Sequence, residues 1–337
     1  MSGGVDSSVA AALMVDAGHD VVGATLKLWG GPSDSGCCSV ADVDDARRVA
    51  QQLGIPHHVF NMTDQFAADV VDPYVAAHAA GRTPNPCIEC NRHIKFDLLL
   101  QRTVRLGFDA LATGHHARVD PGPPYRLRRG ADPLKDQSYV LSMLGQHQLA
   151  NVVLPVGSMT KDDVRRHAAR LGLRTATKPD SQDVCFIHGA EGRHGFLERR
   201  LDLHPAEVVD GATGATVGAV DAVELVTVGQ RRGMGHGTDG RRRYVVAVDV
   251  PARRVVVGPD PTVDRVALDP ATVTWVADPL APGARAVAQV SAHGRPAACT
   301  VDAGPVVRFD DPQRPVAPGQ TVALYDADAV VGAGIAA

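Results

Sequence analysis

Residues 2–8 read SGGVDSS and directly precede an apolar stretch with helical spacing, and this junction decides the fold. Val9, Leu13 and Met14 fall on one helical face. Gly18 stands where such a helix would end. A glycine-rich turn before a helix directs several backbone N–H groups and the positive end of the helix dipole toward one point. The sequence therefore predicts a phosphate-binding turn rather than an ordinary capped helix, although it lacks the GxxxxGK[ST] pattern with its lysine.

Helical and apolar stretches alternate after this turn. An apolar run over residues 21–28 precedes a predicted helix over 39–53 and a short strand over 57–61. A second helix over 94–108 is followed by a buried strand over 109–116. Alternation of this kind is typical of an α/β fold with a parallel sheet, in which ligands bind at the carboxyl ends of the strands.

The position of the turn at the start of the chain is unusual for this fold. A doubly wound fold leads into its first phosphate turn from a parallel strand, whereas Met1 directly precedes the turn here. We therefore expect translation to begin upstream of Met1, so that this sequence lacks the first strand. We also expect the turn at residues 2–8 and Gly114 to meet at the carboxyl edge of the sheet.

The middle of the chain combines turn, helix and β signals. Residues 119–130 predict a hairpin, and residues 135–144 predict a helix. Thr160, with Asp163 three residues later, predicts a capped helix. From about residue 193 short β-like runs alternate with Gly, Pro and Asp, which indicates a barrel or sandwich. We expect domains at 1–192, 193–256 and 257–337.

Composition narrows the class of protein. The chain has 337 residues, a net charge of -4 and six cysteines. So few cysteines in so long a chain argue against a secreted disulfide scaffold, and no apolar run of about eighteen residues predicts a membrane span. No leader pattern precedes the first motif, so we expect a soluble protein in the cytosol, where its cysteines serve chemistry. The charge argues against a broadly basic nucleic-acid binder.

A single CxxC lies in RTPNPCIECN, residues 82–91, and supplies Cys87 and Cys90. Such a pair is compatible with half a zinc site, a redox dithiol, iron-sulfur ligands or a nucleophile with a neighbour. A four-cysteine zinc site would need distant partners, and Pro86 and Asn91 do not match a redox helix start. The histidine pairs at 57–58 and 115–116 lack metal-ligand spacing, and Cys37, Cys38 and Cys299 are interpreted as structural.

Taken in order, the turn SGGVDSS, GRTPNPCIECN, ATGHH, KDQSYVL, DSQDVCFI and TVGQRRGMGHG resemble the bacterial tRNA 2-thiouridylase family MnmA, within the PP-loop ATP pyrophosphatase superfamily. The resemblance covers nearly the whole chain. It implies a PP-loop α/β domain, a small central β-rich domain and a C-terminal β-barrel. It also implies ATP-dependent replacement of the C2 oxygen of the wobble uridine, position 34 of certain tRNAs, by sulfur, with Mg²⁺ accompanying the ATP.

The resemblance also implies site residues. Cys185 corresponds to the persulfide carrier, loaded by a cysteine desulfurase or a relay protein, and Cys90 to the second catalytic cysteine, which releases the sulfur or closes a disulfide with Cys185. The implied ATP-binding residues are Met1, Ser2, Gly3, Gly4, Val5, Asp6, Ser7, Ser8, Leu26 and Gly114. The implied tRNA-binding residues are Asn85, Pro86, Cys87, His115, Lys135, Asp136, Gln137 and Gln320.

Two alternatives stay open. Many family members carry Asp where Cys87 stands, so Cys87, Cys90 and Cys185 are candidate ligands of an iron-sulfur cluster. A remoter alternative is another PP-loop ATPase that acts on tRNA or on an amide substrate. The sequence also departs from the family at Ser291-Ala292, where an Arg-Tyr pair is usual. Arginines that could contact RNA cluster near the hairpin and near residues 231–243; they are Arg118, Arg126, Arg128, Arg129, Arg231, Arg232, Arg241, Arg242 and Arg243.

Overall fold

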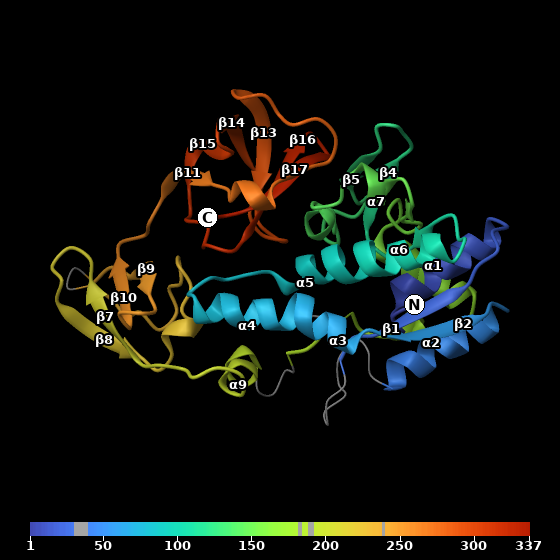
Figure 1. Cartoon of the computed structure of the whole chain (residues 1–337), viewed down its shortest axis with the longest axis horizontal. Helices are drawn as coiled ribbons and strands as arrows, with labels where there is room; N and C mark the ends of the chain where they lie inside the picture. The colour runs from blue at the N-terminus through green and yellow to red at the C-terminus, as the bar shows by residue number, and fades with distance from the viewer. Residues whose placement is uncertain (30–39, 181–183, 188–191, 238–239) are drawn as a thin grey trace. The chain divides into compact units, whose positions relative to one another are not determined.

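The computed structural model describes residues 1–29, 40–180, 184–187, 192–237 and 240–337. The chain forms two units (Figure 1). Unit 1 comprises residues 1–70, 87–190 and 328–330, and unit 2 comprises residues 71–86, 191–327 and 331–337. The two units are described separately. Within the described part of the chain, no helix has the length and apolarity that crossing a membrane requires.

Unit 1 contains the predicted α/β alternation. Helix α1 (Val5–Asp16) follows the glycine turn, and Gly18 takes a left-handed φ of +83° just beyond its end, as predicted. Strands β1 (Gly23–Lys27) and β2 (His57–Asn61) flank α2 (Val40–Gln52). They pair in parallel, with Gly23 opposite His57. The prediction of parallel strands joined by a helix is therefore confirmed.

A second parallel pair joins β3 (Leu111–Ala112) to β6 (Val152–Val153). A core cluster beside these strands draws on α1, α2 and α8 (Lys161–Arg170). Val9, Val49 and Val164 are fully buried in it. Each such side chain contributes about 1.5–3 kcal/mol by leaving water. This packing fixes the start of α1, and with it the glycine turn.

The predicted helix at 94–108 begins earlier and ends earlier than the sequence indicated. It starts as α5 (Pro86–Glu89), continues through the π-helical η2 (Cys90–Leu99) and ends as α6 (Leu100–Arg105). Proline is suited to the first helical turn because its missing N–H is not needed there. Ile88, Ile94 and Phe96 are fully or almost fully buried. Cys90 therefore lies inside a long helical segment rather than in a loop.

The hairpin is confirmed and the helix predicted at 135–144 is wrong. Strands β4 (Ala117–Asp120) and β5 (Arg126–Arg129) pair antiparallel. Residues 135–144 form only the short turn η3 (Tyr139–Leu141). The Asp136 carboxylate accepts hydrogen bonds from the Gly130 and Ser138 amides, at 2.9 and 3.0 Å. These side-chain bonds compete with a helical ladder, which is how Asp and Ser favour turns over helices.

The helix predicted from Thr160 is confirmed as α8. The Thr160 hydroxyl accepts from the Asp163 amide, and the Asp163 side chain accepts from the Thr160 amide, which completes a capping box. The short η4 (Arg174–Thr177) follows it. The remaining short helices of unit 1 are α3 (Thr63–Phe66), η1 (Ala67–Val71, whose last residue falls in unit 2) and α7 (Gln146–Leu149).

Unit 2 is rich in β structure, as predicted. One four-stranded sheet has the order β8-β7-β10-β9, with β7 and β10 parallel and the other neighbours antiparallel. Its strands are β7 (Ala206–Asp210), β8 (Thr216–Val220), β9 (Tyr244–Asp249) and β10 (Arg254–Gly258). The helices of this unit are α4 (Asp72–Ala79), α9 (Gly192–Glu198), η5 (Val223–Leu225) and η6 (Pro270–Thr272).

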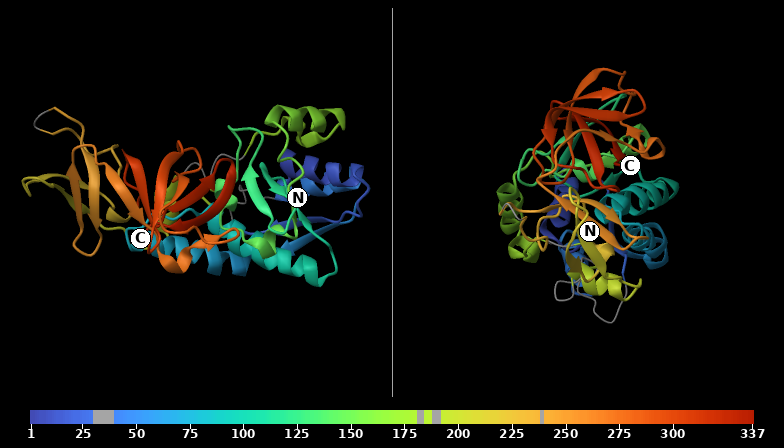
Figure 2. Two further views of the ribbon diagram at one scale, coloured as in Figure 1. Left: turned by 90° about the horizontal axis from the view of Figure 1, so that it is seen from above. Right: turned by 90° about the vertical axis from the view of Figure 1, so that its left-hand side faces the viewer.

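The C-terminal strands form a larger sheet, drawn in orange to red in Figures 1 and 2. Its order runs β11-β15-β14-β13-β16-β17, and β12 pairs with β17. Cys299, Val307 and Val322 are fully buried in its core. The strands are β11 (Val263–Ala267), β12 (Thr274–Trp275), β13 (Ala284–Gln289), β14 (Ala297–Asp302), β15 (Val306–Gln313), β16 (Thr321–Asp326) and β17 (Ala329–Ile335).

Candidate active site

The glycine turn is ordered by its own serines. The Ser2 amide donates to the Ser7 hydroxyl at 3.0 Å, and the Ser8 hydroxyl donates to the Gly4 carbonyl at 2.8 Å. Gly3 has a φ of +71°, and a Cβ there would lie 2.4 Å from the Asp42 carbonyl oxygen, so only glycine fits. The first amides of α1 have no partner within the helix, as at every helix start. The turn therefore presents N–H groups suited to an anion.

Gly114 lies directly against this helix start. A Cβ at Gly114 would come within 2.6 Å of both the Asp6 carbonyl carbon and the Ser7 amide nitrogen. The expectation that the turn and Gly114 meet is confirmed by this contact. Leu26 is half-buried in β1, and the Thr25 hydroxyl donates to the Met1 carbonyl at 2.6 Å. The turn and Gly114 are thus in contact in unit 1, and Leu26 is next in sequence to Thr25, which bonds to Met1.

Asp6, the single charged residue of the turn, is held by two cationic or polar partners. The Lys161 ammonium donates to both carboxylate oxygens, at 2.8 and 2.7 Å, and His116 Nε2 lies 3.1 Å from one of them. Burial alone would raise the pKa of Asp6, but the hydrogen bonds from His116 and Lys161 lower it overall. Asp6 is therefore an ionised carboxylate with its charge compensated by side chains from distant parts of the sequence.

Lys161 also binds Asp180, at 2.8 Å, and only 8% of the lysine residue is exposed. Lys135 and Arg165 hold the same carboxylate, at 2.8 and 2.9 Å. Burial opposes the shift, but the hydrogen bonds from Lys135 and Lys161 lower the pKa of Asp180 to about 2. The sequence reasoning missed Lys161 and Asp180. One signal was available, because a lysine in the first turn of a helix opposes the helix dipole and calls for acidic partners.

Three residues expected to contact tRNA are engaged in this part of unit 1. Lys135 binds Asp180 as described, and Asp136 binds Arg129 at 2.8 Å. The Gln137 side chain accepts from the His116 amide at 2.8 Å. Each residue of the stretch 135–137 is therefore held by a contact within the protein. Two of those contacts, to Asp180 and to His116, are made with residues that also belong to the network around Asp6.

His115, another residue expected to contact tRNA, follows Gly114 and is half-buried. The Thr113 hydroxyl lies 2.8 Å from its Nδ1, and its ring lies 5.6 Å from that of Phe96. Burial, with the positive charges of Lys95 and His116, holds the pKa of His115 well below its ordinary value. His115 is therefore neutral at physiological pH and can accept or donate one hydrogen bond at each ring nitrogen.

The two cysteines of the CxxC have different surroundings. Cys90 is buried at the start of η2, whereas Cys87 is exposed one turn earlier in α5. Next to Cys90, the Asn91 amide donates to the Val140 carbonyl at 3.1 Å, and its buried side-chain oxygen has no hydrogen-bond partner in the described structure. The two thiols therefore lie in different environments. This difference favours separate roles for Cys87 and Cys90 over a role as one redox or ligand pair.

Cys185 is half-buried and is followed by Phe186, which is 1% exposed. The Phe186 ring packs on Phe66 and Trp29, with centroid distances of 5.7 and 6.2 Å. This aromatic cluster anchors the chain directly after the cysteine. Neighbouring residues 181–183 and 188–191 lie outside the described residues.

The iron-sulfur alternative does not fit the described structure. Cys87, Cys90 and Cys185 all lie within the described ranges, and no three His, Cys, Asp or Glu side chains there are grouped so as to hold a metal ion. Cys299 behaves as a structural thiol, as predicted. It is buried in the barrel, its Sγ donates to the Ala286 carbonyl, and burial raises its pKa to about 11. Cys37 and Cys38 lie outside the described residues.

The remaining expected tRNA contacts belong to unit 2. Asn85 is half-buried, Pro86 is buried and Gln320 is half-buried in the turn before β16. In the same unit, Ser291 and His293 are exposed near the end of β13.

Several of the arginines considered for RNA contact have carboxylate partners. Arg118 and Arg128 both bind Asp328, and Arg129 binds Asp136. Arg165, in α8, is not a solvated residue either. It lies half-buried and donates to the Ala176 and Lys178 carbonyls, at 2.9 and 3.0 Å, as well as to Asp180.

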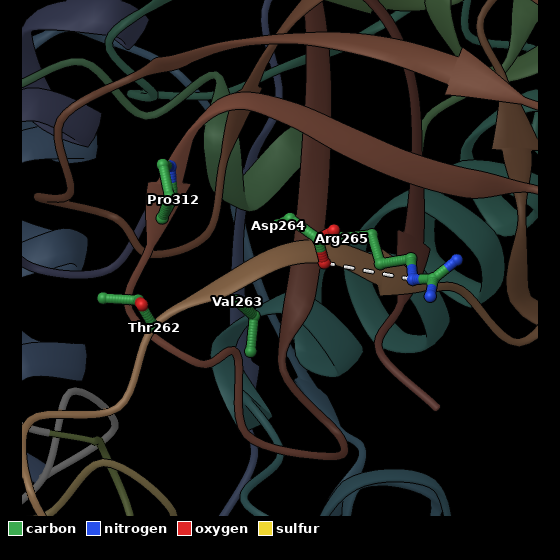
Figure 3. A pocket seen from close by; sticks show the side chains of 5 residues that line it. All are labelled: Thr262, Val263, Asp264, Arg265 and Pro312. Carbon is green, nitrogen blue, oxygen red and sulfur yellow. Dashed lines mark ion pairs between the residues drawn. The ribbon is translucent and has the colours of Figure 1, made fainter.

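A shallow pocket lies on the barrel of unit 2 (Figure 3). Its lining residues are Thr262, Val263, Asp264, Arg265 and Pro312, and an ion pair of 3.9 Å joins Asp264 to Arg265. None of these residues is an expected site residue, and the pocket has no converging polar groups that would define a ligand.

Comparison with known families agrees with the architecture. The family model described as tRNA methyl transferase HUP domain matches residues 1–189. The tRNA methyl transferase PRC-barrel domain matches residues 194–259, and the aminomethyltransferase beta-barrel domain matches residues 267–336. A solved structure, the U34-tRNA thiolase NcsA from Methanococcus maripaludis with its [4Fe-4S] cluster, gives a TM-score of 0.35 at 18% identity, over 55% of this chain and 58% of that chain. That likeness is too low to support an argument.

Similar proteins of known name match over almost the full length. The tRNA-specific 2-thiouridylase MnmA of Roseiflexus sp. (strain RS-1) is 46% identical, over 99% of this chain and 97% of that protein. The MnmA proteins of Frankia casuarinae and Mycolicibacterium paratuberculosis are 47% and 49% identical, over 99% and 98% of this chain and 96% of each relative. With the three domain matches in the same order, the chain belongs to the MnmA family of tRNA-specific 2-thiouridylases.

Proposed function

We propose that this chain is an ATP-dependent tRNA sulfurtransferase that replaces the C2 oxygen of uridine by sulfur, and that the uridine is the wobble base at position 34. The observation that carries the proposal is the turn at residues 2–8, which presents backbone N–H groups suited to an anion and has Gly114 packed against it. Full-length identity of 46% to a named thiouridylase supports it. We also propose domains at 1–192 for catalysis, 193–256 for tRNA binding and 257–337 for the barrel.

The turn suits the first chemical step. A uracil C2 carbonyl has a poor leaving oxygen, so we propose that this oxygen attacks the α-phosphorus of ATP. An O–P bond forms, the bond between the α-phosphorus and the bridging oxygen breaks, and pyrophosphate leaves with the electron pair. The N–H groups at the start of α1 stabilise its negative charge. The adenylate then makes AMP the leaving group at C2.

Sulfur arrives in the proposed second step as a persulfide on Cys185, supplied by a cysteine desulfurase or a relay protein. The Cys90 thiolate attacks the Cys185 sulfur, breaks the persulfide bond and releases sulfide, which attacks C2 and displaces AMP. Alternatively, the outer persulfide sulfur attacks C2 and displaces AMP first, and the Cys90 thiolate then attacks the Cys185 sulfur and breaks its bond to the transferred sulfur, which stays on the base. Both orders leave a Cys90–Cys185 disulfide, which a dithiol reductant must return to thiols.

Magnesium is expected to accompany the nucleotide. Asp6 is the only carboxylate in the turn, and its side chain is 30% exposed. One carboxylate together with phosphate oxygens and waters is a donor set that Mg²⁺ accepts. When bound, the ion would neutralise charge on the phosphates. Because the cysteines do not fit an iron-sulfur cluster, no step passes through one.

For tRNA binding, we propose that the target base lies near Asn85, Pro86 and Cys87. The other proposed contacts are His115, Lys135, Asp136, Gln137 and Gln320. A wobble base must leave its anticodon stack to reach an enzyme's reacting groups, so the contacts must hold a splayed nucleotide. Because tRNA and ATP are cytoplasmic, we expect the enzyme to act in the cytoplasm.

Nucleoside analysis tests the assignment. tRNA from a strain that lacks the gene should contain no 2-thiouridine at position 34, and the wild-type gene should restore it. Unchanged 2-thiouridine in the deletion strain would overturn the proposal. A Cys185→Ser gene should fail to restore the nucleoside, whereas a PP-loop enzyme that forms amides would keep its activity after that change. Measuring AMP and pyrophosphate with purified tRNA separates the adenylation step from sulfur transfer.

A further inference from the structure

The ion-pair network around Lys161 connects two parts of the proposed active site that are far apart in sequence. Asp6 belongs to the nucleotide turn, and Asp180 stands five residues before Cys185 (185 − 180). Lys161 Nζ donates to both carboxylates, at 2.7 Å to Asp6 and 2.8 Å to Asp180. We propose that Lys161 is a positioning residue that ties the nucleotide turn to the segment carrying Cys185, an inference that rests on the proposed function.

The position of Lys161 is itself fixed by several contacts. Its amide donates to the Asp132 carboxylate at 3.0 Å, and Thr160 caps the helix that it begins. Only a tenth of its side chain is exposed. A buried lysine of this kind loses hydration, so its ammonium depends on good contacts with Asp6 and Asp180. Those contacts therefore constrain the turn and Asp180 together.

The segment before Cys185 is fastened on two sides. Lys161, Lys135 and Arg165 hold its Asp180 carboxylate. Two residues earlier, Lys178 binds Asp42 and Asp45 of α2, at 2.6 and 2.8 Å. Asp42 lies against Gly3, so Lys178 is not independent of the nucleotide turn. Arg165 holds Asp180 from the same helix as Lys161 but has no described contact with Asp6, which makes it the matched control for a merely structural role.

Charge also links Lys161 to the nucleotide. The turn has no lysine of its own, and its only charged side chain is an acid. Without Lys161, Asp6 keeps His116 as its described side-chain partner, and the turn loses the cation that offsets this carboxylate before Mg²⁺ and nucleotide bind. Leaving one member of a buried ion pair without its partner is costly, and about 1.4 kcal/mol of that cost falling on nucleotide binding would weaken it tenfold. Lys161 should therefore influence nucleotide affinity without belonging to the turn.

The first measurement is affinity. Full-length protein is titrated with Mg²⁺ and α,β-methylene-ATP by calorimetry, as wild type, Lys161→Met, Lys161→Arg, Arg165→Met and Ser7→Ala. We expect the affinity of Lys161→Met to fall about tenfold. Lys161→Arg keeps the charge and should stay within about threefold of wild type. Arg165→Met should bind the analogue as wild type does, although it loses an ion pair to the same Asp180 carboxylate.

The second measurement is the reactivity of Cys185 without nucleotide. Iodoacetamide labelling is followed at the Cys185 peptide by mass spectrometry, so the other cysteines do not interfere. Lys135 and Arg165 still hold Asp180 in Lys161→Met, so we expect a modest rise in the Cys185 labelling rate, about threefold, and Lys161→Arg should restore the rate toward wild type. Thermal unfolding of each variant confirms that the protein measured is folded.

The outcomes separate this inference from the proposed function. An affinity loss in Lys161→Met but not in Arg165→Met, with faster Cys185 labelling, supports the positioning role. Equal losses in both variants, unchanged affinity in Lys161→Met, or an unchanged labelling rate overturns it. If Ser7→Ala weakens binding but Lys161→Met does not, only this inference fails. If Ser7→Ala binds as wild type does, the proposed nucleotide turn itself is wrong.

Discussion

The contact between Gly114 and the start of α1 makes a sharp prediction about nucleotide binding. A methyl group added by Gly114→Ala would lie 2.6 Å from the Asp6 carbonyl carbon and 2.6 Å from the Ser7 amide nitrogen. Both atoms are backbone, so neither can rotate away as a flexible side chain would. The φ of Gly114 does not lie in the left-handed region, so alanine causes no backbone strain there. The substitution acts only through the collision with the start of α1.

The size of the effect follows from relieving that collision. An ordinary Cβ contact needs about 3.4 Å or more. The strand end and the helix start must therefore separate by most of an ångström. Overpacking of this kind costs about 1–3 kcal/mol. If the collision is relieved by displacement of the N–H groups of the turn, the same free energy is lost from nucleotide binding. The affinity for an ATP analogue then falls by between about fivefold and about a hundredfold.

Calorimetry with α,β-methylene-ATP measures the affinity, and thermal unfolding measures stability. Gly218→Ala is a suitable control, because the nearest atom to its added Cβ is 3.9 Å away and the residue lies in strand β8. We expect the control to match wild type in both assays. Gly114→Ala with wild-type affinity and wild-type stability would show that the turn and Gly114 are not in the contact described, and would refute the site geometry.

Three further predictions follow from other residues. Cys90→Ser should leave AMP formation intact yet abolish 2-thiouridine in the tRNA assay; loss of AMP formation would contradict separate steps. Burial outweighs a hydrogen bond to the Glu224 carbonyl and lowers the pKa of His78 to about 4, so the unfolded state binds more protons than the fold between pH 6.5 and 4. Stability should therefore fall by about 3 kcal/mol as the pH drops through that window, and urea unfolding of His78→Phe should lack this dependence. Thr160→Ala should cost about 1 kcal/mol in urea unfolding by removing the cap of α8, and no loss would argue against the capping box.

Most of the elements that the sequence predicted correctly depend on local signals. Gly18 ends α1 because a left-handed residue closes a helix, and Thr160 begins α8 because its hydroxyl satisfies an orphan amide. Both are decided within a few residues of chain. The contact of Gly114 with the turn also could be predicted, since the carboxyl ends of parallel strands share one edge of a sheet.

The helix predicted at 135–144 fails partly for a local reason. Asp136 accepts hydrogen bonds from the amides of Gly130 and Ser138, six and two residues away, so this turn signal lies within a short window of sequence. The bond from the His116 amide to the Gln137 side chain spans 21 residues, and only the fold brings those two residues together. The contacts of Arg165 with the Ala176 carbonyl and with Asp180 likewise depend on the fold.

The turn itself shows why its cation could not be found by motif. Its seven residues include one charged side chain, Asp6, and hydrogen bonds hold the pKa of Asp6 below its ordinary value, so the carboxylate is ionised at any physiological pH. Alone, that charge would oppose a polyphosphate at the N–H groups beside it. The ammonium of Lys161, 155 residues away in sequence, compensates this charge in the folded protein. A phosphate turn without a lysine is therefore not a turn without a cation, and the compensating charge must be sought in space.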